Sequence, residues 1–176
     1  MPMDLLDQFE TAARDAAATV ERIPCTPEAI AAAVERTAPS ALRIAVAEPQ
    51  DLPAELFNRC RSLRSVFKSR TKTDLSATEV GITESFAGVA RTGSICVSVD
   101  HGDIGYVSLL ARMHIAVLAQ ESIVERPSDL MRADTLSGKG LRRNYVFVTG
   151  PSATADMGPL VRGVHGPHQL HILVLV

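Results

Sequence analysis

The chain has 176 residues, of which 46% are hydrophobic and 22% charged, a composition typical of a chain that builds an apolar core. Eighteen basic and twenty acidic residues give a net charge of −2, so the chain lacks the strong positive charge expected of a nucleic-acid-binding protein. Aromatic residues make up only 4%, which leaves few rings for stacking on bases. We expect no nucleic-acid partner.

The three cysteines, Cys25, Cys60 and Cys96, lie far apart, and no C-x-x-C motif occurs. This pattern predicts neither a disulfide framework nor a metal or iron–sulfur cofactor held by this chain. The first ten residues are acidic, and no apolar run approaches eighteen residues, so we expect no signal peptide and no membrane span. A cytoplasmic protein is the expectation.

Helical patterns dominate the first forty residues. Apolar residues at helical spacing predict one amphipathic helix over residues 3–23, which Pro24 ends. A second helix is expected from Pro27, with Thr26 as its N-cap, up to Pro39. The sequence therefore predicts an N-terminal helical segment, residues 1–40, that packs on an α/β domain formed by residues 41–176.

A basic stretch follows the first predicted strand of that domain, residues 42–48. Six lysine or arginine residues and no acid occur within residues 59–72, and its first part has the apolar spacing of a helix. Two interpretations stay open: a solvated helix face, or a surface for an anion or an acidic partner.

From residue 79 onward, short apolar runs alternate with helix-compatible segments. This alternation predicts βαβ units and an α/β fold with a mainly parallel sheet flanked by helices. The strands are expected at 79–83, 94–99, 114–119, 144–150 and 170–176, the helices at 84–90, 106–113 and 126–133, and an exposed loop at 134–143.

Polar and glycine residues gather at the ends of these strands, where parallel sheets bind their ligands beyond the carboxyl ends. The turn after the fourth run carries Gly150, Pro151, Ser152, Thr154 and Asp156. Its backbone N–H groups are suited to hold an anionic oxygen, with Asp156 as a base or hydrogen-bond acceptor. In the alternative interpretation, the serine caps a turn and the aspartate holds the backbone.

Three histidines, His165, His168 and His171, form an H-x-x-H-x-x-H array. A metal site is disfavoured because the Gly-Pro pair at 166–167 forbids a helix through the array and no nearby carboxylate completes a ligand set. His165, between two glycines, is the candidate general acid, base or hydrogen-bond donor. We expect His114, which opens an apolar strand, to be a satisfied core or edge histidine, and Cys96 to be buried and inert.

Several of these segments, taken in order, resemble the LUD family of lactate-utilisation proteins. The resemblance covers residues 79–176 and rests mainly on two motifs, TGPSATAD at 149–156 and GVHGP at 163–167. With isolated cysteines, the chain looks like the shorter C-type members, which lack the cluster-binding motifs of the B-type. The resemblance implies a fold akin to ribose-5-phosphate isomerase and CoA transferases.

The resemblance also implies function. It implies a role in the oxidation of L-lactate to pyruvate within a multiprotein complex, beside A-type and B-type iron–sulfur partners that alone would carry the clusters. The family's usual A-E-T-G-T turn reads Ala-Arg-Thr-Gly-Ser here, so any role of that acid is lost or passes to Glu84. With the residues at the strand ends, the resemblance gives as ligand-binding candidates Thr92, Gly93, Ser94, Gly150, Pro151, Ser152, Thr154, Gly163 and Gly166, and as catalytic candidates Glu84, Asp156 and His165.

Three hypotheses follow, the third of which is a small-ligand sensor or a purely structural partner without chemistry of its own. In the first, the chain is a non-redox subunit of the lactate-oxidising complex and binds a small anionic metabolite, an iron–sulfur partner, or both. In the second, it is a stand-alone isomerase or CoA-transferase-like enzyme whose acid–base residues act on a small anionic substrate.

Overall fold

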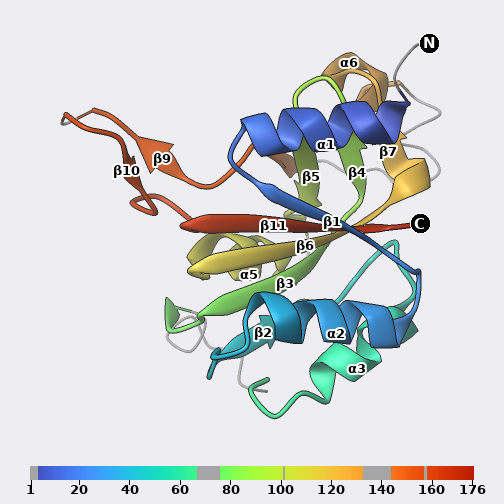
Figure 1. The fold of residues 1–176 in the computed structure, drawn as a ribbon, viewed down its shortest axis with the longest axis vertical. Helices are drawn as coiled ribbons and strands as arrows, with labels where there is room; N and C mark the ends of the chain where they lie inside the picture. The colour runs from blue at the N-terminus through green and yellow to red at the C-terminus, as the bar shows by residue number, and fades with distance from the viewer. Residues whose placement is uncertain (1–3, 67–75, 101, 133–143, 157) are drawn as a thin grey trace.

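Five parallel strands form the central sheet of the protein (Figure 1). The computed structural model describes residues 4–66, 76–100, 102–132, 144–156 and 158–176. The strand order is β1-β11-β6-β3-β2, and every neighbouring pair is parallel. The strands are β1 (Thr19–Ile23), β2 (Ile44–Val46), β3 (Val80–Ser85), β6 (Met113–Ala119) and β11 (Gln169–Leu175).

Both faces of the central sheet are covered. Alternate residues of β6 enter different cores: Ala116 and Leu118 pack with one apolar cluster, Ile115 and Val117 with the other. Helix α2 (Pro27–Thr37) belongs to the second cluster, and helices α1 (Leu5–Asp15) and α5 (Ile104–Leu110) contribute to the first. Burial on both faces explains why β6 and β11 are nearly continuous apolar runs. The predicted α/β fold with a mainly parallel sheet flanked by helices is confirmed.

A second sheet of four strands, in the order β7-β4-β5-β8, packs beside α1 (Figure 1). Its strands β5 and β8 are two of the predicted strands, but they pair antiparallel and lie outside the central sheet. The helix predicted over 84–90 is wrong, because residues 87–89 form β4 and pair with β5. Local sequence permits either state there, and pairing with β5 in a hairpin and with β7 decides. The strands are β4 (Ala87–Val89), β5 (Ser94–Ser98), β7 (Ile123–Val124) and β8 (Tyr145–Val148).

The long N-terminal helix predicted over 3–23 is wrong in its second half. Helix α1 ends at Asp15, where the N–H groups of Ala17 and Ala18 bond to the carbonyls of Arg14 and Ala13 in a Schellman-type turn. The chain then forms β1, an outermost strand of the central sheet, which pairs with β11. Part of the first forty residues therefore belongs to that sheet.

Helix α2 begins as predicted, since Thr26 Oγ1 accepts a hydrogen bond from the N–H of Ala29. The basic stretch starts as a short helix, but its residues 67–72 lie outside the described residues, as does the predicted loop at 134–143. The remaining elements are η1 (Ala54–Phe57), α3 (Asn58–Arg61), η2 (Gln120–Ser122), α6 (Pro127–Leu130), β9 (Ala153–Thr154) and β10 (Val161–Arg162).

Strands β9 and β10 form an antiparallel arm that projects from the body of the protein (Figure 1). Among the described helices, none combines the length and the apolarity needed to cross a membrane.

Candidate functional site

Two glycine turns of the family-like motifs pack against the carboxyl-terminal half of α1. Gly93 has φ +64°, and a Cβ there would lie 2.1 Å from the backbone nitrogen of Ala13. Gly150 has φ +69°, and a Cβ there would lie 1.9 Å from the carbonyl oxygen of Ala16. Both positions combine a left-handed backbone with a contact that leaves no room for a side chain. These glycines therefore hold the two turns against the helix.

Three hydroxyl groups link the same two turns. Thr92 Oγ1 lies 2.7 Å from Ser94 Oγ, which in turn lies 2.7 Å from Thr149 Oγ1. The chain of hydrogen bonds joins the turn before β5 to the turn after β8. Thr92 and Ser94 thus fix the position of the 149–152 turn.

The loop 163–167 is tied to Ser152 by three hydrogen bonds. The Ser152 N–H donates to the carbonyl of Pro167 at 2.9 Å, and its own carbonyl accepts from the N–H of Gly163 at 2.9 Å. Its Oγ accepts from the N–H of His165 at 3.3 Å. The two family-like motifs, separate in sequence, therefore form one local structure at the base of the β9–β10 arm.

This structure borders a cavity of about 480 Å³, which we call the amino-edge cavity because His114 and Leu170 lie at the amino ends of β6 and β11. Its lining combines polar residues with apolar residues of α5 and β8. Its lining comprises Val99, Gly105, Ser108, Leu109, His114, Val146, Phe147, Val148, Thr149, Gly150, Pro151, Ser152, Ala153, His165, Gly166, Pro167 and Leu170.

His114 is the most unusual residue of the amino-edge cavity. Its side chain is 1% exposed, and Nε2 lies 2.9 Å from Thr83 Oγ1, whereas the buried Nδ1 has no hydrogen-bond partner among the described residues. Burial lowers the pKa of this imidazole to about 4, so it is neutral at pH 7. An unpaired buried nitrogen costs free energy, which a ligand atom would recover.

Five of the predicted site residues meet at this cavity: Gly150, Pro151, Ser152, His165 and Gly166. Asp156 does not lie with them. It is exposed on the tip side of the arm, where its N–H donates to Thr154 Oγ1 at 3.4 Å. The pairs Thr154–Val161 and Ala153–Arg162 of the arm stand between Asp156 and the loop that carries His165. Thr92, Gly93, Ser94, Thr154 and Gly163 likewise lie outside the lining.

Glu84 lies at the other edge of the sheet. It lies three positions along β3 from Gly81, the register partner of His114, a distance of about 10 Å. The carboxylate is buried and accepts hydrogen bonds from the N–H groups of Gln50, Asp51 and Leu52 at 2.6–3.2 Å. These hydrogen bonds anchor the loop after β2 to β3.

The three histidines of the array lie in different parts of the structure. His165 lines the amino-edge cavity, His168 lies against Gly163, and His171 Nδ1 lies 2.6 Å from Thr19 Oγ1 of β1. Within the described parts of the chain, no group of three or more His, Cys, Asp or Glu residues is arranged to hold a metal ion.

His114 and Ser108 are cavity residues that the sequence did not predict as such. His114 was expected to be satisfied, and it is indeed buried, but only one of its ring nitrogens has a partner. The rule that parallel sheets bind their ligands beyond the carboxyl ends of the strands does not lead to this cavity, which lies at the amino ends of β6 and β11. A histidine at the amino end of an apolar strand was the available signal.

Known proteins similar to this chain carry related names. Lactate utilization protein C of Bacillus subtilis (strain 168) is 41% identical over 93 residues, which are 50% of this chain and 38% of that protein. The protein of the same name from Shouchella clausii (strain KSM-K16) is 37% identical over 92 residues, covering 51% and 40%. The match thus spans about two-fifths of each relative. Lactate utilization protein B of Bacillus pumilus (strain SAFR-032) is 25% identical over 133 residues, covering 72% and 26%.

The fold has a counterpart among solved structures. The crystal structure of a DUF162 family protein from Deinococcus radiodurans superposes with a TM-score of 0.70 at 20% identity, covering 99% of this chain and all of that one. The family model of the LUD domain matches residues 8–175, which include both sheets, the amino-edge cavity and the β9–β10 arm. The chain belongs to the LUD domain family.

Proposed function

We propose that this chain is a non-redox component of an L-lactate utilisation system and that the amino-edge cavity binds a small anionic metabolite. The names of the relatives favour the system, and the unpaired Nδ1 of buried His114 is the observation that carries the ligand site. Iron–sulfur partner proteins of the A-type and B-type would take the two electrons that leave when L-lactate becomes pyruvate.

The polar residues that line the cavity suit a 2-hydroxy or 2-oxo acid. Ser152 and His165 offer donors, Ser108, whose hydroxyl donates to the carbonyl of Gly105 at 3.0 Å, offers an acceptor, and the apolar side chains of Leu109 and Phe147 suit an alkyl group. In one neutral tautomer, His114 Nδ1 accepts a hydrogen bond from a ligand hydroxyl, and in the other its N–H donates to an oxo or carboxylate oxygen. A neutral imidazole therefore fits both members of the lactate–pyruvate pair.

The stand-alone enzyme hypothesis has less support. It requires Glu84, Asp156 and His165 to act together, but the Glu84 carboxylate accepts three backbone N–H groups and Asp156 lies on the tip side of the arm. A fold relationship to ribose-5-phosphate isomerase and CoA transferases remains part of the proposal, supported by the family resemblance.

Ligand binding is tested on the purified chain. We expect L-lactate or pyruvate to stabilise it against urea by about 2.7 kcal/mol at one hundred times the dissociation constant, and propionate, which lacks the 2-substituent, to stabilise it less. His114→Gln should abolish the difference between the acids, whereas the exposed His168→Gln should keep it. Equal stabilisation by all three acids, or none by any, would overturn the ligand assignment.

Partner binding needs a separate experiment. Tagged chain recovered from its native extract is expected to retain a cysteine-rich partner with iron–sulfur absorbance, and Arg59→Gln with Arg64→Gln should weaken the retention if the basic stretch is the contact surface. A colourless, solitary chain would contradict the partner proposal and leave the ligand proposal to the urea experiment.

A further inference from the structure

A second and larger cavity lies at the opposite edge of the central sheet. It has a volume of about 880 Å³ and is bordered by Ala119 at the end of β6, Leu175 at the end of β11 and Cys25, two residues beyond β1. We call it the carboxyl-edge cavity. Open parallel sheets bind their ligands outside the carboxyl ends of the strands, so its position is one where recognition sites recur.

The lining of this cavity is mainly apolar and continues onto the surface. Leu6, Leu56 and Ile123 form part of its floor and belong to the buried cores. At its margin, Leu5 is 38% exposed and Val176 is 55% exposed. Exposed large apolar side chains beside an apolar cavity mark a surface that binds another molecule.

One wall of the cavity is held in place by Glu84. The loop that carries Leu52 and Pro53 is bound to the buried Glu84 carboxylate through three consecutive N–H groups, those of residues 50–52. A charge-assisted bond to each N–H fixes the loop before any ligand arrives. A preformed wall reduces the conformational entropy that is lost on binding.

The charged residues that line the cavity are all acidic. Asp4, Glu55 and Glu121 border it, and no lysine, arginine or histidine is among the described residues that line it. Such a margin repels phosphate and carboxylate groups and attracts cations. A sugar phosphate, a CoA thioester or a free organic acid is therefore a poor occupant of this cavity.

We propose that the carboxyl-edge cavity docks a segment of a partner protein whose apolar side chains are flanked by lysine or arginine. The apolar floor would receive the apolar side chains, and the three carboxylates at the margin would pair with the flanking cations. A segment suits the site better than a small molecule because the apolar lining reaches the protein surface at the exposed side chains of Leu5 and Val176. The proposal does not depend on what the amino-edge cavity binds.

The test compares two synthetic amphipathic 14-residue peptides with the same leucine face, one with lysine and one with glutamate on the polar face. Fluorescence anisotropy of labelled peptide with the purified chain measures affinity. We expect the lysine peptide to bind at least about tenfold more tightly than the glutamate peptide, with an affinity that falls as salt rises. Equal affinity of the two peptides would overturn the proposal.

Variants locate the binding. Glu55→Gln with Glu121→Gln should lower the affinity for the lysine peptide several-fold, and Leu5→Gln should lower this affinity by a factor that does not depend on salt. Glu35→Gln, on the exposed face of α2, should leave the affinity unchanged. A bimane label on Cys25 provides a direct readout, because Cys25 is exposed at the cavity while Cys60 and Cys96 are fully buried. Unchanged bimane emission on saturation, or equal weakening by Glu35→Gln, would show that binding occurs elsewhere.

Discussion

Gly93 and Ala13 touch backbone to backbone, although eighty residues separate them in sequence. The left-handed φ of Gly93 turns its Cα toward α1, and a Cβ there would lie only 2.1 Å from the nitrogen of Ala13 and 2.4 Å from its Cα. Gly150 makes the equivalent approach to Ala16 one turn further along. The helix thus rests on two glycine turns, and the second of them borders the amino-edge cavity.

Gly93→Ala should therefore destabilise the fold strongly. The new Cβ has to displace backbone atoms and also occupy a left-handed conformation, so we expect a loss of at least about 3 kcal/mol in the free energy of unfolding. Gly102→Ala is the matched control, because Gly102 has φ +69° but nothing within 4 Å of an added Cβ. Urea unfolding should show a loss of only about 1 kcal/mol for the control. Similar losses for both variants would contradict the close-packing explanation.

Continuous apolar runs made the central sheet predictable, because a strand buried on both faces has no polar alternation. The runs that became β3, β6 and β11 were located from the sequence to within one or two residues. The strand β1 was not, since TVERI fits a helix locally and only its pairing with β11, some 150 residues away, selects the extended state. Pairing with β5 in a hairpin and with the more distant β7 likewise places residues 87–89 in β4.

The candidate site was predictable only in part. Turn chemistry marked Gly150, Ser152 and Gly166, and these residues meet at one cavity. The sequence had no signal that Gly93 serves the packing of α1, or that Glu84 anchors residues 50–52 at the other sheet edge. Those roles depend on which segments the topology brings together.

Ala17→Gly should stabilise the protein. Ala17 is exposed and has φ +65°, the left-handed conformation of the residue that follows the C-cap of α1, where glycine is the usual occupant. Removing the Cβ relieves a strain of roughly 1 kcal/mol, partly offset by the greater freedom of glycine in the unfolded chain. A rise in the urea midpoint is the expected result, with Asp15→Gly inside the helix as a control that should lower it. A fall for Ala17→Gly would exclude strain at this position.

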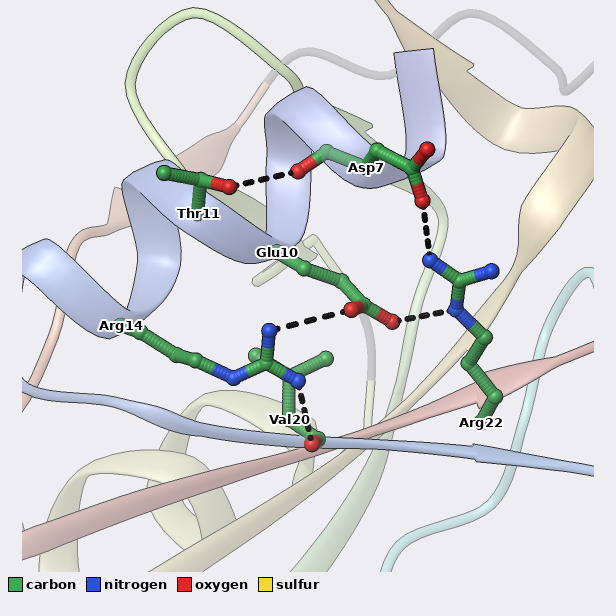
Figure 2. Close-up of polar contacts among 6 residues, drawn as sticks. All are labelled: Asp7, Glu10, Thr11, Arg14, Val20 and Arg22. Atoms are coloured by element: carbon green, nitrogen blue, oxygen red, sulfur yellow. Dashed lines mark hydrogen bonds and ion pairs between the residues drawn. The ribbon is translucent and has the colours of Figure 1, made fainter. Parts of the chain in front are cut away.

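A network of charged side chains joins α1 to β1 (Figure 2). Glu10, 7% exposed, accepts hydrogen bonds from Arg22 Nε at 2.6 Å and from Arg14 at 3.1 Å, and Arg22 also pairs with Asp7. Arg14 bonds in addition to the carbonyl of Val20 at 3.2 Å. Burial raises the pKa of Glu10, but the two arginines outweigh it and the pKa is lowered on balance.

The lowered pKa makes the contribution of Glu10 dependent on pH. A carboxyl group whose pKa is lower in the folded state stabilises the fold above its unfolded pKa and loses this effect as the pH falls through the folded value. Glu10→Gln should thus cost about 1–2 kcal/mol at pH 7 and progressively less below about pH 4.5. Urea unfolding of the wild type and the variant across this range measures the gap. The exposed Glu35→Gln should show no such closing gap, and a gap that stays constant would contradict the ionic role.

His114 should make the protein less stable in mildly acidic solution. Its folded pKa of about 4 lies below the ordinary value of 6.5, so between these values the unfolded chain binds a proton that the folded chain excludes. Stability is therefore complete above about pH 6.5 and falls as the pH approaches 4, by roughly 3 kcal/mol in all. His171, whose pKa is also lowered by burial, acts in the same direction, so the comparison has to be between the wild type and His114→Gln.

The variant should lose less stability than the wild type between pH 7 and pH 4.5. Two-dimensional NMR of the imidazole provides the direct measurement, and we expect the His114 ring to stay neutral down to about pH 5. An anionic ligand in the amino-edge cavity would favour the protonated ring and shift its midpoint upward, because opposite charge opposes the effect of burial. A midpoint near 6.5 without ligand would mean that water reaches His114, and the unpaired Nδ1 would then need no ligand to satisfy it.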